Sequence, residues 1–142
     1  MPIVNFHLVD GMSTPEQDER LLIGACQLYA EVLKAPLERV RAFITLHRPG
    51  QFAVAGGLCA HNGLHAPFFD FIVLDGRPLD ERHRLLRGFT ELLVDTLGVR
   101  RELVRGSCRR VEPQDWAIGG EPASVIRKDE VAARAARSTP PP

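Results

Sequence analysis

The chain has 142 residues, 44% of them hydrophobic, which is enough to bury the core of one compact domain. Eighteen basic and eighteen acidic side chains cancel, so the overall charge does not favour binding to nucleic acid or to a membrane. The sequence shows no leader-like pattern and no apolar run of membrane-spanning length, so we expect a cytoplasmic protein.

The sequence contains an internal repeat. Residues Pro2–Gly11 (PIVNFHLVDG) return as Pro67–Gly76 (PFFDFIVLDG) at an offset of 65 residues. After a slip of one residue the offset becomes 64, and it aligns Val40 and Arg41 with Val104 and Arg105, and Phe52 with Trp116. We therefore predict two copies of one unit, residues 2–57 and 67–120, linked by residues 53–66 within a single domain of residues 1–128.

Each copy reads as strand, helix, strand. The two opening runs are apolar and end at Asp-Gly, which is typical of strands. The first helix should begin after Thr14, with Pro15 in its first position and Gln17 placed to complete a capping box. The second helix should stop at Gly98, and the second strands should cover about residues 40–47 and 103–111.

A strand, helix, strand unit with so long a crossover pairs its strands in parallel. The fold class we predict is therefore α/β (α+β), with two tandem β-α-β units forming a four-stranded mixed sheet that carries both helices on one face. The other face should be too apolar to remain in water, so subunits should cover it by packing sheet against sheet. The alanine- and arginine-rich residues 129–142 should form a flexible C-terminal tail.

Three segments carry a resemblance to a known family. These are Pro2 directly after Met1, APLERVR at Ala35–Arg41, and DWAIGGEPASVIRK at Asp115–Lys128. Together they resemble the 4-oxalocrotonate tautomerase family, and in particular its fused, double-length members, in a superfamily that also contains cis-3-chloroacrylic acid dehalogenase and malonate semialdehyde decarboxylase. The resemblance implies the β-α-β tautomerase fold, a homotrimer, and an isomerase whose catalytic base is an amino-terminal proline.

The two prolines at the heads of the copies differ chemically. Once Met1 is removed, Pro2 is a secondary amine with a free lone pair, and a larger fraction of it is unprotonated near neutrality, and so able to act as a base, if its pKa falls below the value of about 8 typical of α-amino groups. The nitrogen of Pro67 belongs to a peptide bond and has no basicity. We therefore expect one working site per chain.

The resemblance assigns further site residues. It implies that Arg77 and Arg105 bind the substrate carboxylate and stabilise the enolate, and that Arg41 and Trp116 contact the substrate. Sequence alone leaves open whether Arg41 or Arg105 reaches Pro2, and from which subunit. Met12 stands where the first copy would carry the counterpart of Arg77.

The resemblance also implies a small, carboxylate-bearing substrate of the 2-hydroxydienoate or 2-oxo acid type and no cofactor. We expect no metal site, because Cys59, His61 and His65 have poor spacing for zinc. We expect no nucleic acid or membrane partner.

Two other functions stay open at this point. A hydratase, dehalogenase or decarboxylase on the same scaffold would use Pro2 as a cationic acid and a carboxylate such as Glu112, Asp115 or Asp70 to activate water. A non-catalytic trimeric binding protein would have lost its site.

Overall fold

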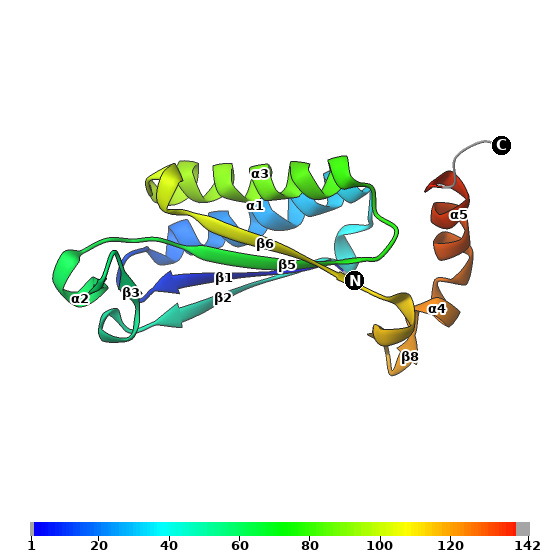
Figure 1. Cartoon of the computed structure of the whole chain (residues 1–142), viewed down its shortest axis with the longest axis horizontal. Coiled ribbons are helices and arrows are strands. Elements are labelled where there is room, and N and C mark those ends of the chain that lie inside the picture. Colours follow the sequence, from blue (N-terminus) through cyan, green and yellow to red (C-terminus); the bar gives the residue numbers. More distant parts are fainter. Residues whose placement is uncertain (1, 139–142) are drawn as a thin grey trace.

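The computed structural model describes residues 2–138 and contains two similar halves (Figure 1). Its strands are β1 (Ile3–Val9), β2 (Arg41–His47), β3 (Ala53–Val54), β4 (Gly57–Leu58), β5 (Phe68–Leu74), β6 (Arg105–Val111), β7 (Ala117–Ile118) and β8 (Glu121–Pro122). Its helices are α1 (Pro15–Leu33), α2 (Cys59–Asn62), α3 (Leu79–Leu97), α4 (Ala123–Ile126) and α5 (Lys128–Ser138). Short 3-10 turns precede β2, β3, β6 and β7 at Leu37–Arg39, Pro49–Gln51, Arg101–Leu103 and Pro113–Asp115.

The main sheet has the strand order β2-β1-β5-β6. Strands β1 and β2 are parallel, as are β5 and β6, and the central pair β1 and β5 is antiparallel. Both long helices, α1 and α3, lie on the same face of this sheet (Figure 1). The predicted four-stranded mixed sheet with two helices on one face is confirmed.

Local sequence signals determine where the long helices begin and end. Thr14 caps α1, since its side chain accepts from the Gln17 amide while the Gln17 side chain accepts from the Thr14 amide. Helix α3 ends at Gly98, whose φ of 68° is in the left-handed region. The equivalent residue at the end of α1 is Lys34, with a φ of 53°. The predicted cap and glycine stop are confirmed.

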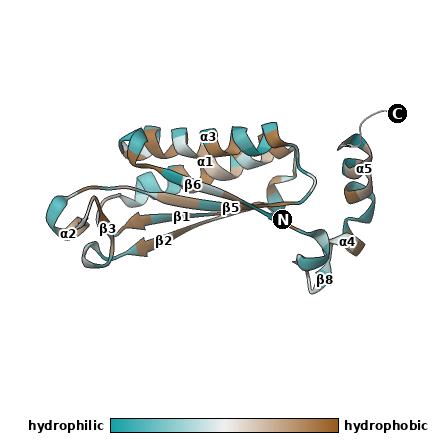
Figure 2. Ribbon diagram, viewed as in Figure 1, coloured by the Kyte–Doolittle hydropathy of each residue, from teal (hydrophilic) through white to brown (hydrophobic). Residues whose placement is uncertain are grey.

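The core lies between the sheet and the two helices, where the apolar sides of these elements meet (Figure 2). Alternate residues of β1 and β5 point into it, and its largest fully buried side chains are aromatic: Phe6, Tyr29, Phe69, Phe71 and Phe89. Phe89 makes edge contacts with the other four rings. Such ring pairs stabilise the fold beyond the burial of their area, by about 0.5–1.5 kcal/mol each.

The two helices cross with reciprocal contacts. A Cβ added to Gly24 on α1 would lie 2.9 Å from Leu92 on α3, and one added to Gly88 on α3 would lie 2.6 Å from Leu28 on α1. Gly24 aligns with Gly88, and Leu28 with Leu92, in the repeat. The duplication in sequence is therefore an approximate two-fold relation in space.

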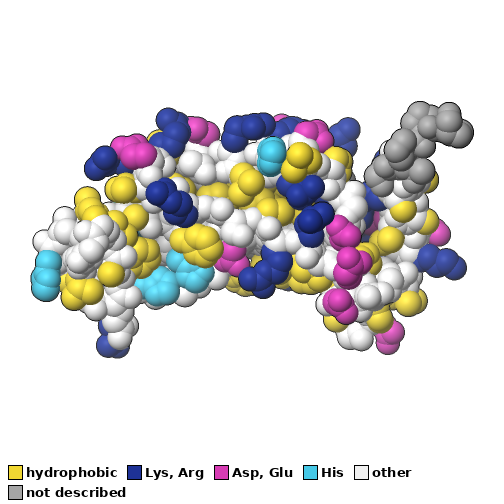
Figure 3. Space-filling model, viewed as in Figure 1, with side chains coloured by type: hydrophobic (Ala, Val, Ile, Leu, Met, Phe, Trp, Pro, Cys, Tyr) yellow, Lys and Arg dark blue, Asp and Glu magenta, His cyan; other side chains and the backbone are white. Residues whose placement is uncertain are grey.

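The other face of the main sheet carries no helix (Figure 1). Phe43 and Phe68 are exposed there. The same face carries a half-buried polar group, in which His7 and His47 are hydrogen-bonded at 2.8 Å and His7 Nε2 lies 3.6 Å from Asp70. Figure 3 shows histidine and apolar side chains together along this side of the sheet. The expectation of an apolar open face is therefore met only in part.

Two of the expected boundaries change. Residues 53–66 were expected to be a linker, but they contain the hairpin β3-β4 and helix α2, which correspond to β7-β8 and α4 of the second half. Ala55 and Gly56 take positive φ at the hairpin turn, as Gly119 and Gly120 do in the other. Each repeat thus extends beyond the predicted ends at residues 57 and 120.

The flexible tail expected at residues 129–142 is wrong over residues 129–138, which lie in helix α5. Acidic residues in its first turn, Asp129 and Glu130, suit the helix dipole. An ion pair between Glu130 and Arg39 joins α5 to the rest of the molecule. The last part of the expected tail, residues 139–142, lies outside the described residues.

Candidate active site

Pro2 lies immediately before β1 and is buried. Its carbonyl accepts a 3.0 Å hydrogen bond from the amide of Arg41, which extends the β1-β2 pairing by one step. Pro2 contributes to a small cavity of about 20 Å³, enough for one water molecule. The other residues that line it are Leu33, Ala35, Arg39, Val73, Leu74, Arg77 and Arg134.

This cavity adjoins a cleft of about 720 Å³ between α5 and the ends of α1 and β5, and the two share five lining residues, including three arginines. The described side chains that line the cleft include five basic ones and two acidic ones: Lys34, Arg39, Arg77, Arg134 and Arg137 against Glu81 and Glu130. Positive charge therefore predominates around Pro2, as a site for an anionic substrate requires.

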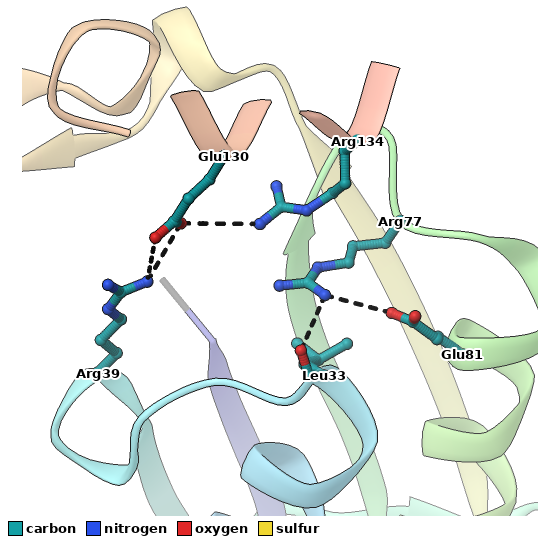
Figure 4. Close-up of polar contacts among 6 residues, drawn as sticks. All are labelled: Leu33, Arg39, Arg77, Glu81, Glu130 and Arg134. Carbon is teal, nitrogen blue, oxygen red and sulfur yellow. Dashed lines mark hydrogen bonds and ion pairs between the residues drawn. The ribbon is translucent and has the colours of Figure 1, made fainter. Parts of the chain in front are cut away.

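Arg77 is held in a defined position within this cleft (Figure 4). It follows Gly76, whose φ of 104° turns the chain after β5. The Arg77 Nη1 group donates to the Leu33 carbonyl at 3.0 Å and lies 3.4 Å from the Glu81 carboxylate. The side chain is only 16% exposed, so its guanidinium is already ordered before any ligand binds.

Two further arginines, Arg39 and Arg134, line the cavity with Pro2, and neither was predicted from the sequence as a site residue. Figure 4 shows both directed toward the carboxylate of Glu130. Arg39 Nη1 donates to both Glu130 oxygens at 3.2 Å, and Arg134 Nη2 lies 3.9 Å from one of them. Burial lowers the pKa of Arg134, and nearby Arg77 lowers this pKa further, whereas Glu130 raises it.

Arg41 is beside Pro2 along the backbone, but its side chain takes a different direction. The residue aligns with Ile3 across the β1-β2 pair, so it belongs to the open face of the sheet, and its Nη1 group donates to the Arg39 carbonyl at 3.2 Å. Arg41 does not line the cavity that contains Pro2.

Arg105 and Trp116 are not brought to Pro2 within one chain. Because β1 and β5 are antiparallel, the second copy begins at the opposite end of the sheet, beside Leu8 and about 20 Å from Pro2. Arg105 starts β6 at that end, and its amide donates to the Pro67 carbonyl at 3.1 Å. Trp116 precedes the β7-β8 hairpin and does not line the cavity with Pro2.

The carboxylates expected for a hydratase also lie elsewhere. Asp70 is on the open sheet face beside His7, and a hydrogen bond with Asp75 raises the pKa of Glu112. Asp115 ends the 3-10 turn before β7. Among the described residues, no carboxylate lines the small cavity that contains Pro2.

No group of three or more His, Cys, Asp and Glu side chains within residues 2–138 is arranged to hold a metal ion. Cys59 is buried in α2, and the His65 imidazole lies 3.3 Å from the amide of Val9. None of the helices in the same part of the chain is long and apolar enough to cross a membrane.

The sequence of the first repeat matches a known protein family. The family model described as "Tautomerase enzyme" matches residues 2–62, which is the first repeat including its hairpin and α2. A probable tautomerase K2 from Dickeya dadantii (strain 3937) is 36% identical over 63 residues, covering 44% of this chain and 94% of that protein. A 2-hydroxymuconate tautomerase from Pseudomonas sp. (strain CF600) is 39% identical over 56 residues, covering 39% of this chain and 87% of that protein. The chain therefore belongs to the tautomerase family, whose members are isomerases.

Solved structures match both repeats together. The structure of a native fused 4-OT has a TM-score of 0.80 and 20% identity, and the match covers 88% of this chain and 98% of that one. A fused 4-OT described as a symmetric trimer has a TM-score of 0.78 and 22% identity, with coverage of 87% and 98%. The fold is thus that of the double-length tautomerases.

Proposed function

We propose that Pro2, freed by removal of Met1, is the general base of a tautomerase that acts on small 2-hydroxydienoate or 2-oxo acids. The observation that supports this most directly is the cavity where Pro2 is buried with Arg39, Arg77 and Arg134 and with no carboxylate among the described lining residues. Such surroundings disfavour a further positive charge, so we expect the pKa of the free Pro2 amine to lie below about 8.

The reaction we propose is a proton shuttle in which nothing is oxidised or lost. The Pro2 nitrogen takes the proton of the enol hydroxyl, the electron pair moves through the conjugated system, and the resulting prolinium ion returns the proton to a carbon atom. Arg77 binds the substrate carboxylate or the oxygen on which charge develops, because its guanidinium is already ordered beside Pro2. A positioned base of this kind accelerates proton transfer by about 10²–10⁴-fold.

Arg105, Arg41 and Trp116 enter this proposal through assembly. Fused 4-OT neighbours are described as trimers, and we propose a homotrimer for this chain. The open face of its sheet, with exposed Phe43 and Phe68, is the surface we expect subunits to cover. A neighbouring subunit could then place Arg105, which lies about 20 Å from Pro2 in one chain, beside the cavity, and could add a Trp116 to the lining that Pro2 lacks within its own chain.

The test uses an electrophile. A related structure is described as inactivated by 2-oxo-3-pentynoate, an alkynone whose triple bond accepts a free amine. Mass spectrometry should show that Met1 is removed and that one molecule of this reagent is attached to Pro2, with loss of isomerase activity toward 2-hydroxymuconate or phenylenolpyruvate. Label on a different residue, or an unlabelled chain that retains Met1, would contradict the proposal and favour the non-catalytic binding protein.

A further inference from the structure

The Glu130 carboxylate occupies a place where a substrate carboxylate could bind. It comes from α5 and projects into the cleft, where Arg39 and Arg134 approach it from two sides (Figure 4). The two oxygens share the 3.2 Å bonds from Arg39, and Arg134 adds a longer contact of 3.9 Å. A guanidinium group binds a carboxylate in the same way whether the carboxylate belongs to a glutamate side chain or to a small molecule. A substrate carboxylate could therefore make the contacts that Glu130 makes here.

This ion pair is one that an incoming anion could replace. Arg39 is 26% exposed and Glu130 is 41% exposed, and pairs so accessible to water contribute little free energy to the fold. Glu130 is in the first turn of a short terminal helix, so its side chain can turn toward solvent without movement of the sheet. Arg39 is fixed by the turn that leads into β2.

We propose that Arg39 and Arg134 form a carboxylate-binding subsite that Glu130 fills in the resting chain and leaves when substrate binds. This inference rests on the proposed function, since it assumes that the ligand of Arg77 and Pro2 extends into the same cleft. It predicts a preference for dicarboxylates: one carboxylate binds near Arg77 and the other replaces Glu130 between Arg39 and Arg134. Arg134 belongs to α5, and Arg39 belongs to the turn before β2. A substrate carboxylate between them would therefore hold α5 in place, as Glu130 does in the resting chain.

The experiment measures binding rather than turnover, with the full chain in its native assembly. Adipate and hexanoate have the same chain length and differ in the second carboxylate, and neither can tautomerise as a dienol. Isothermal titration calorimetry gives the ratio of their affinities. The Glu130→Gln variant should bind adipate about fivefold more tightly and leave hexanoate nearly unchanged, because a competing carboxylate is gone.

Matched variants separate this effect from a general change in charge. Asp129→Asn removes a negative charge from the neighbouring, exposed position of the same helix and should change adipate affinity by less than about twofold. Arg39→Gln and Arg134→Gln should each abolish the preference for adipate. Arg137→Gln, which removes a cleft-lining charge that has no ion pair with Glu130, should retain most of it.

Either of two results would overturn the inference. One is a Glu130→Gln variant that binds adipate no better than the wild type, which would make Glu130 a structural contact of α5. The other is an adipate preference that survives in either Arg39→Gln or Arg134→Gln. Both results are independent of Pro2 chemistry, so a failure of the subsite and a failure of the general base are distinguishable.

Discussion

The two ends of the main sheet are built on the same backbone but differ in their chemistry. At each end a buried proline heads a strand, and its carbonyl accepts from the amide of an arginine that starts the parallel neighbour: Arg41 at 3.0 Å for Pro2 and Arg105 at 3.1 Å for Pro67. The residues around the prolines then diverge. Arg39 and Arg77 at the first end align with Leu103 and Met12 at the second.

This comparison shows that the fold by itself does not make a site. The second end keeps the strand, the proline and the hydrogen bond, but its proline nitrogen is an amide and the two aligned arginines are replaced by apolar side chains. At the first end, a nitrogen that processing can free coincides with a surplus of positive charge. Four experiments test how complete this division is.

The largest effect should come from the prolines themselves. Pro2→Ala should lower kcat/KM by about 10³-fold, since a primary amine in a more flexible chain replaces a fixed secondary amine. Pro67→Ala should leave kcat/KM within about twofold of the wild type, because that nitrogen holds no free lone pair. Steady-state kinetics with 2-hydroxymuconate measures both. Equal losses in the two variants would show that the division between the ends is wrong.

The second experiment exchanges the aligned pair of Arg77 and Met12. Arg77→Met should reduce kcat/KM by about 10²-fold, in the range found when one donor to a developing oxyanion is removed. Met12→Arg should restore no activity in a Pro2→Ala background, because an arginine at the second end has no basic nitrogen beside it. Recovery of turnover in that double variant would mean that the second end is a dormant site.

A third comparison concerns packing in the two halves. Across the parallel pairs, Val4 faces Ala42 in the first half, whereas Phe69 faces Gly106 in the second. A Cβ at Gly106 would lie 2.1 Å from the Phe69 ring, so Gly106→Ala should lower the free energy of unfolding by about 2–3 kcal/mol. The double variant Phe69→Val/Gly106→Ala recreates in the second half the Val4–Ala42 pair of the first half. Its free energy of unfolding, measured by urea denaturation, should be higher than the sum of the two single changes predicts. Simple additivity would show that the ring and the glycine are not coupled.

The smallest effect is a pH dependence near the second end, where the His65 Nε2 atom accepts from the Val9 amide at 3.3 Å. Burial lowers the pKa of His65 below its usual value of 6.5. As the pH falls below about 6.5, the unfolded chain therefore binds a proton that the folded chain resists, and stability decreases until the folded pKa is passed. The loss should be the smallest of the four effects, and it should appear as a flatter pH profile of the unfolding midpoint in His65→Gln than in the wild type. If the unfolding midpoint depended on pH equally in His65→Gln and in the wild type, His65 would be excluded as the source of the pH dependence.

Much of the fold was predictable because its determinants are local or repeated. Thr14 and Gln17 form the cap that their spacing indicates, and Gly98 ends α3 at a left-handed φ. The repeat register alone makes Arg77 and Met12 counterparts. These signals depend on neighbours in sequence or on the similarity of the two copies.

The remaining parts depend on tertiary contacts that no local pattern contains. Arg39 and Arg134 share Glu130 only because α5 folds back over the cleft. The alanine content, the acidic first turn and the i, i+4 spacing of Glu130 and Arg134 favour the helix itself but do not indicate where it packs. The sequence left open whether Arg41 or Arg105 reaches Pro2, because this depends on how β1 meets β5, and their antiparallel contact sends the start of the second copy, with Arg105, to the far end of the sheet. The roles of Arg41, Arg105 and Trp116 stay predictions.

The residue after α1 has a consequence for how this protein could be made more robust. Lys34 takes the left-handed conformation that Gly98 takes after α3, and a side chain with a Cβ is strained there by about 1 kcal/mol. Lys34 also lines the cleft beside Pro2, where it adds a positive charge. Thermostabilising screens that select glycine at position 34 would thus relax the helix end and, in the same step, make the entrance less attractive to acidic metabolites.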